Sequence, residues 1–134
     1  MTWPAQHITI SVSRDPGEVS AFAGDPVNLP RWASGLSSGI RHERGRWLAD
    51  SPMGDVEVAF VGPVAAGVLD HDVTLPDGTV AHNPLRVLRN DRGSEVVFTL
   101  YRREGVTEAE YAADAAAIES DLRALRDIVE GVVR

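Results

Sequence analysis

The sequence predicts a single α+β domain in which a curved antiparallel sheet wraps around a long C-terminal helix. Three observations carry this prediction. Segments of alternating apolar and polar residues are separated by short turns, two short helical segments follow the first of them, and a long apolar stripe at helical spacing lies near the end of the chain. A chain of 134 residues suits one domain, 1–134, without a linker or internal repeat.

The opening of the chain predicts one strand followed by two short helices. Residues 7–13 alternate apolar and polar side chains, which indicates a strand with one buried face. Asp15 and Pro16 are typical of a helix start, because aspartate accepts hydrogen bonds from the first turn and proline suits the first helical position. The residues 24–26 (GDP) end that helix and begin a second one.

Six further strands are predicted in the middle of the chain, which makes a sheet of seven. Turn residues at 44–45, 76–78 and 90–93 separate these strands and favour tight hairpins. Strands joined in series by short turns form an antiparallel meander. The six predicted strands are 40–43, 46–49, 56–61, 68–75, 79–88 and 95–102.

The last segment predicts one amphipathic helix of about 25 residues. Thr107 to Glu110 (TEAE) has the form of a capping box, in which the threonine and glutamate side chains bond to each other's backbone amides. A long apolar stripe needs a surface to lie on, and a curved sheet supplies it. The stripe consists of Tyr111, Ala115, Ile118, Leu122, Leu125, Val129 and Val132.

This order of elements resembles the START-like superfamily, also called the polyketide cyclase/dehydrase-like or SRPBCC superfamily. The segment 25–32 (DPVNLPRW) is similar to the family pattern D-P-x-N-x-P-x-W, and 94–100 (SEVVFTL) is similar to its penultimate strand. The strand opening at 8–10, the helix start at 15–19 and the pair Asp121-Leu122 in the last helix complete a resemblance that covers nearly the whole chain.

The resemblance implies the helix-grip fold, in which a seven-stranded antiparallel sheet grips the long helix and two short helices close one end. It also implies an apolar pocket between sheet and helix. It implies no single reaction, since the superfamily includes lipid carriers, hormone receptors, polyketide cyclases and chaperone cofactors.

Composition excludes several classes of function. The net charge is -7 and all 13 basic residues are arginine, which argues against nucleic acid and anionic membranes as partners. Without cysteine there is no thiol chemistry, and without a long apolar run or a leader we expect a cytoplasmic protein with no membrane span. No cofactor motif is present. No metal site is expected either, because Asp70, His71 and Asp72 alternate between the two faces of a strand.

The composition of the helix stripe predicts where the pocket lies. Ala112 and Ala115 are small, whereas Ile118 and Leu122 are large, which indicates a wedge-shaped gap near Tyr111 and Ala115. The alternative is that the large aromatic side chains fill this gap. The residues expected to contact a ligand are Trp32, Trp47, Phe60, His71, Asn83, Phe98, Tyr111, Ala115 and Ile118.

His71 is the strongest candidate for chemistry, because its predicted face is the apolar, inward one. A three-residue loop at 76–78 places Asn83 opposite His71, whereas a two-residue loop places His82 there. A histidine in such a cavity can orient a ligand or act as a general base, and Tyr111 is a further candidate at the pocket mouth. The alternatives are a core histidine satisfied by backbone or water and a packing tyrosine.

Three functions follow from these expectations. The first is a carrier or sensor that binds a small hydrophobic molecule. The second is a polyketide cyclase- or dehydratase-like enzyme with a His-centred site, whose catalytic candidates are His71, Asn83 and Tyr111. The third is a protein-interaction module with a filled core and an exposed apolar patch. Apolar residues on the outer face at Val61, Val97 and Tyr101 hint at a homodimer.

Overall fold

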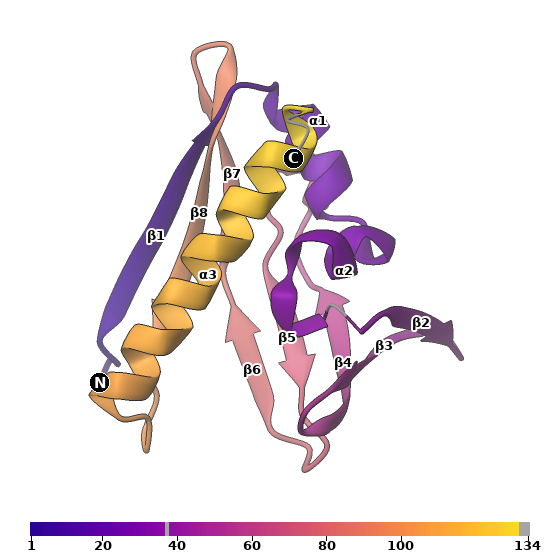
Figure 1. The fold of residues 1–134 in the computed structure, drawn as a ribbon, viewed down its shortest axis with the longest axis vertical. Coiled ribbons are helices and arrows are strands. Elements are labelled where there is room, and N and C mark those ends of the chain that lie inside the picture. The colour runs from indigo at the N-terminus through magenta and orange to yellow at the C-terminus, as the bar shows by residue number, and fades with distance from the viewer. Residues whose placement is uncertain (37, 132–134) are drawn as a thin grey trace.

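Two antiparallel sheets carry the fold in the computed structural model, which describes residues 1–36 and 38–131. The three-stranded sheet has the order β1 (Ala5–Val12), β8 (Gly93–Tyr101), β7 (Leu85–Asn90). The five-stranded sheet has the order β2 (Ile40–Glu43), β3 (Arg46–Ser51), β4 (Gly54–Phe60), β5 (His71–Thr74), β6 (Val80–Asn83). The helix α3 (Glu108–Val129) crosses in front of the smaller sheet, and the β2–β3 hairpin extends away from it (Figure 1).

The two short helices after the first strand are confirmed. They are α1 (Pro16–Ala23) and α2 (Leu29–Trp32), and Asp15 caps α1 by accepting a hydrogen bond from Gly17 N at 2.9 Å. Both helices lie beside the C-terminal half of α3 (Figure 1). Short 3-10 turns complete the connections, at η1 (Pro26–Asn28), η2 (Ser34–Leu36) and η3 (Val64–Ala66).

The expected single seven-stranded sheet is wrong, because the structure has eight strands in two sheets. The strand predicted over 79–88 is divided at Pro84 into β6 and β7. Proline has no backbone N–H to donate to a ladder, so it interrupts pairing at this point. Upstream of it the chain pairs with β5, and downstream it pairs with β8.

A short backbone junction connects the two sheets. Leu69 N donates to Leu85 O at 2.8 Å, and Val87 N donates to Gly67 O at 2.9 Å. The segment that leads into β5 therefore runs beside β7 without forming a full ladder. The result is a bent surface whose two halves face α3 and the short helices at different angles.

Asp70 supports this junction with its side chain. Its Oδ1 accepts hydrogen bonds from Leu85 N at 3.0 Å and Arg86 Nε at 2.9 Å, and Oδ2 accepts from the same guanidinium at 2.8 Å. Asp70 is buried, and the bidentate bond to Arg86 lowers the pKa of its carboxyl. Asp72, two residues further on, pairs with His82 instead.

The register between β5 and β6 shows whether Asn83 or His82 lies opposite His71. Leu75 N bonds to Thr79 O, which makes 76–78 a three-residue loop and pairs His71 with Asn83. His82 pairs with Asp72 on the opposite face, where the two side chains form a bond of 2.6 Å.

The long helix begins with the predicted capping box. Thr107 Oγ1 accepts from Glu110 N and Glu110 Oε1 accepts from Thr107 N, both at 3.1 Å. Leu122 and Leu125 are fully buried, whereas Tyr111, Ala115 and Ile118 in the first half are only half-buried. The helix therefore reaches the core mainly through its second half. Val132, the last residue of the predicted stripe, lies outside the described residues.

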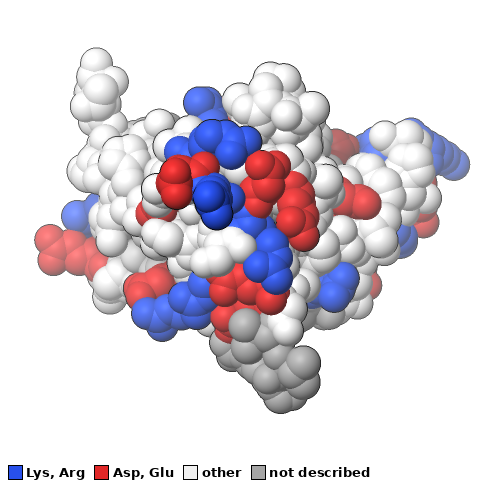
Figure 2. Space-filling model, turned by 90° about the horizontal axis from the view of Figure 1, so that it is seen from above, with Lys and Arg blue, Asp and Glu red and all other residues white. Residues whose placement is uncertain are grey.

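Charges of both signs are interleaved at the end of the molecule that carries the β7–β8 turn and the C-terminal end of α3 (Figure 2). Arg89 pairs with Asp15 at 3.0 Å and Arg14 with Glu18 at 3.9 Å. This face therefore offers no continuous basic field for a phosphate backbone. None of the helices in the described ranges is both long and apolar enough to cross a membrane.

The role of Asp70 leads to a stability prediction. Asp70→Ala leaves the buried Leu85 amide without its side-chain acceptor and Arg86 without a partner, so we expect the free energy of unfolding to fall by about 1–3 kcal/mol. Asp72→Ala is the matched control, because its histidine partner is exposed, and should change stability by less than about 0.5 kcal/mol. Urea denaturation measures both. Equal effects would show that Asp70 does not support the junction.

Candidate functional site

A partly enclosed cavity of about 190 Å³ lies between the short helices, α3 and the sheets. Its walls are mainly apolar, and its polar side chains are those of a tryptophan, a histidine and an aspartate. The lining residues are Leu29, Trp32, Ala33, Gly35, Leu36, Val58, His71, Val73, Phe98, Ile118, Asp121 and Leu122.

Each wall of the cavity follows from the local periodicity of one element. On α3, Ile118, Asp121 and Leu122 are three and four residues apart, so they share a helix face. On the larger sheet, Val58 and Val73 are direct cross-strand partners, so their side chains stand on the same side. Phe98 contributes the wall on β8. The cavity therefore spans both sheets at the place where they diverge.

His71 faces this cavity in a defined protonation state. Its Nδ1 lies 3.0 Å from Leu69 O, and a carbonyl can only accept, so Nδ1 carries the proton of the neutral ring. Burial lowers the pKa of His71, since the surroundings disfavour the charged form. Nε2 makes no hydrogen bond within the described residues, which leaves its lone pair for a molecule in the cavity.

Two aromatic rings hold the imidazole in place. The ring centroids of Phe60 and Phe98 lie 5.7 Å and 6.1 Å from that of His71. Phe60 is the cross-strand partner of His71 on β4. The histidine is therefore fixed by packing on two sides and by its bond to Leu69.

Trp32, in the cavity wall, has a buried hydrogen-bond donor without an acceptor among the described residues. It is 7% exposed, and its indole N–H makes no hydrogen bond within the described residues. A buried donor without an acceptor costs about 1–3 kcal/mol. Such deficits are rare in native proteins, and a bound molecule with an acceptor atom would remove this one.

Asp121 is the acidic group of the cavity. Its Oδ1 accepts a hydrogen bond from Ser34 N at 3.1 Å, which ties η2 to α3. Burial raises the pKa of this carboxyl, although the bond to Ser34 acts in the opposite direction. Among the described residues no arginine or histidine forms an ion pair with Asp121.

The structure brings four of the nine predicted ligand-contact residues together around this cavity: Trp32, His71, Phe98 and Ile118. The cavity lies at Ile118 and Leu122, one to two helical turns beyond the place expected near Tyr111 and Ala115.

The other five residues lie elsewhere. Trp47 and Phe60 line a separate open hollow beside β3 and β4. Asn83 stands beside His71 in register, but its amide donates to Ala81 O at 3.4 Å. Tyr111 donates its hydroxyl hydrogen to Leu100 O at 3.3 Å, and Ala115 lines a groove between α3 and β1.

Sequence reasoning missed Asp121 as a site residue. The available signal was its position, because an acidic residue three places after Ile118 and one before Leu122 falls at the edge of the apolar stripe. The residues around Gly35 and Leu36 gave no signal, since they belong to a loop that only the fold brings to the cavity.

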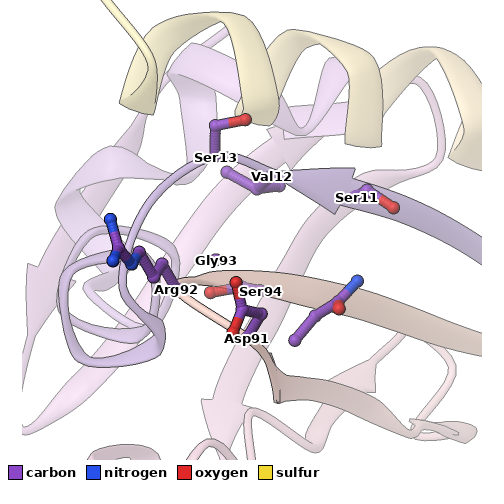
Figure 3. A pocket seen from close by; sticks show the side chains of 8 residues that line it. Ser11, Val12, Ser13, Asp91, Arg92, Gly93 and Ser94 are labelled. Atoms are coloured by element: carbon purple, nitrogen blue, oxygen red, sulfur yellow. The ribbon is translucent and has the colours of Figure 1, made fainter.

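Other hollows lack the features of a binding site. The one in Figure 3 lies between the end of β1 and the β7–β8 turn and is open. Its buried residue Ser94 is already satisfied, because the hydroxyl donates to Arg14 O at 2.7 Å. Within residues 1–36 and 38–131, no three His, Asp or Glu side chains are grouped so that they could hold a metal ion.

Comparisons with known proteins identify the fold. No protein-family model matches the chain, and no curated protein matches it in sequence. Solved structures do match it. The KanY protein is 15% identical with a TM-score of 0.74, and the match covers 98% of this chain and 100% of that one.

Two further structures show the same likeness. XoxI from Bacillus cereus is 13% identical with a TM-score of 0.71, covering 94% of this chain and 95% of that one. Ara h 8.0201 is 12% identical with a TM-score of 0.66, covering 96% and 98%. At these identities the likeness shows the fold alone, and it is consistent with the helix-grip fold that the sequence resemblance implies.

The environment of His71 predicts its titration. We expect the folded-state pKa to lie below the ordinary value of 6.5, and the neutral ring to carry its proton on Nδ1. The unfolded chain then takes up the proton first, so stability from this group is full above pH 6.5 and is lost as pH falls toward the lowered pKa. Proton–nitrogen NMR of the imidazole rings measures both properties. Titration at or above 6.5, or a proton on Nε2, would contradict the described environment.

Proposed function

We propose that this protein binds a small, mostly apolar molecule in the cavity between α2, α3 and the sheets, as a carrier or sensor. The observation that supports this most is the cavity itself. Apolar side chains line most of it, and its few polar groups come from separate elements, as is typical of small-molecule sites.

The size of the cavity limits the ligand. An apolar cavity of about 150 Å³ accommodates a benzene ring. The volume of about 190 Å³ therefore suits a molecule with one ring or two small fused rings, and it is below the usual range of about 300–1,000 Å³ for larger ligands.

The unpaired indole N–H of Trp32 gives independent support. A ligand whose acceptor atom reaches this group would recover part of the cost of the buried donor. The protein-interaction alternative predicts a filled core, and a cavity of this volume favours a small ligand over that alternative.

A second candidate function is catalysis of the cyclase or dehydratase type. The observation that favours it is His71, whose neutral ring presents the Nε2 lone pair to the cavity, as a general base requires. Tyr111 lies away from the cavity, with its hydroxyl bonded to Leu100 O, so this proposal depends on His71 and Asp121.

Filling the cavity tests the binding proposal. Indane, an apolar bicyclic hydrocarbon, should bind the native protein and raise its melting temperature. Ile118→Trp adds side-chain volume at the cavity wall, so we expect binding of indane to fall by about tenfold or more. Calorimetric titration measures the affinity, and circular dichroism verifies that the variant folds.

Ser120→Trp is the matched control, because it adds the same ring to an exposed position of α3 two residues away. It should leave the affinity for indane unchanged. Equal binding by native protein and Ile118→Trp would show that indane binds elsewhere, and the absence of binding to the native protein would count against the proposed function.

A further inference from the structure

Asp121 is an unusual group for an apolar cavity. It lies between Ile118 and Leu122 on the face of α3 that lines the cavity, and the surrounding walls include Leu36 and Val73. Asp121 is half-buried, so its carboxylate loses part of its hydration and needs compensation from charge or hydrogen bonds.

The protein provides only part of this compensation. The groups that hydrogen-bond to the Asp121 carboxylate are the amide and the side chain of Ser34, and both are uncharged. No arginine of the described residues lines the cavity, and its histidine, His71, is held in the neutral form. By contrast, the buried Asp70 has the Arg86 guanidinium at 2.8 Å. Among the described residues Asp121 therefore has no cationic partner, and a ligand could supply one.

His71, like Asp121, offers the cavity a hydrogen-bond acceptor. His71 is held with its proton toward Leu69 O, so Nε2 offers a lone pair. Beside the indole N–H of Trp32, the cavity thus contains two acceptors, one of them anionic, and the whole chain carries a net charge of -7. A molecule with a hydrogen-bond donor and a positive charge complements these features.

We propose that the preferred ligand is a small cyclic or aromatic amine that binds as its ammonium ion, with its N–H groups directed to Asp121 and its ring against the apolar walls. This inference rests on the proposed function and adds the chemical class of the ligand. A carboxylic acid of the same size is excluded by repulsion from Asp121, and a neutral alcohol forms only the weaker uncharged hydrogen bond.

The experiment compares probes that share one bicyclic skeleton. Indane, 2-indanol, 2-aminoindane and indane-2-carboxylate are titrated into the native protein at neutral pH by calorimetry. The amine should bind about tenfold or more tightly than either indane or 2-indanol. Indane forms no hydrogen bond with Asp121 and 2-indanol forms only a neutral one, whereas the ammonium group forms a stronger, charge-assisted hydrogen bond. The carboxylate should bind more weakly than indane.

Asp121→Asn identifies the residue responsible. The variant keeps the shape of the side chain and its acceptor for Ser34 but removes the charge, so it should lose the preference for the amine over indane and 2-indanol. Asp114→Asn is the matched control, because it removes the same charge from an exposed position of α3 and should keep the preference.

The outcomes separate this inference from the proposed function. If indane binds and the amine shows no preference, or if the preference survives in Asp121→Asn, the inference is overturned and the cavity remains a ligand site. If none of the probes binds, both proposals fail. If Asp121→Asn does not fold, the comparison of 2-aminoindane with 2-indanol on the native protein decides, since the two differ only in the polar group.

Discussion

The hydrogen bonds of Asp70 hold together the part of the molecule on which the rest depends. Pro84 interrupts the strand that would otherwise join the two sheets, and the carboxylate of Asp70 accepts the first amide after that interruption, Leu85 N. The guanidinium of Arg86 donates two further hydrogen bonds to the same carboxylate. These bonds keep the segment that leads into β5 beside β7 although the ladder between them is incomplete. The bend that results turns the larger sheet away from the first half of α3.

The cavity is a consequence of that bend. His71 follows Asp70 directly and points to the opposite face of the strand, so the same segment supports the junction and presents a base to the cavity. The second half of α3 covers the space with Ile118 and Leu122, and α2 closes it with Trp32. The space left between these walls is mostly apolar and has a volume of about 190 Å³.

The sequence predicted those features that depend on local periodicity. The capping box at Thr107, the helix start at Asp15 and the inward face of His71 all depend on neighbouring residues, and the structure agrees with them. The break at Pro84 was missed because the alternation continues through it, although a proline within a strand pattern is itself a signal of an interrupted ladder. Four of the nine proposed contact residues line the cavity. Residues such as Tyr111 lie elsewhere because the crossing point of helix and sheet depends on tertiary packing, which periodicity does not specify.

The central claim is that the space enclosed by α2, α3 and the sheets is the ligand site. The most direct measurement is an isotope-filtered NOE spectrum of methyl-labelled protein with bound indane. The account predicts NOEs from indane to the methyl groups of Ile118, Leu122 and Val73, which line the cavity on two different elements. NOEs confined to exposed methyl groups, such as those of Val61 or Val80, would contradict it.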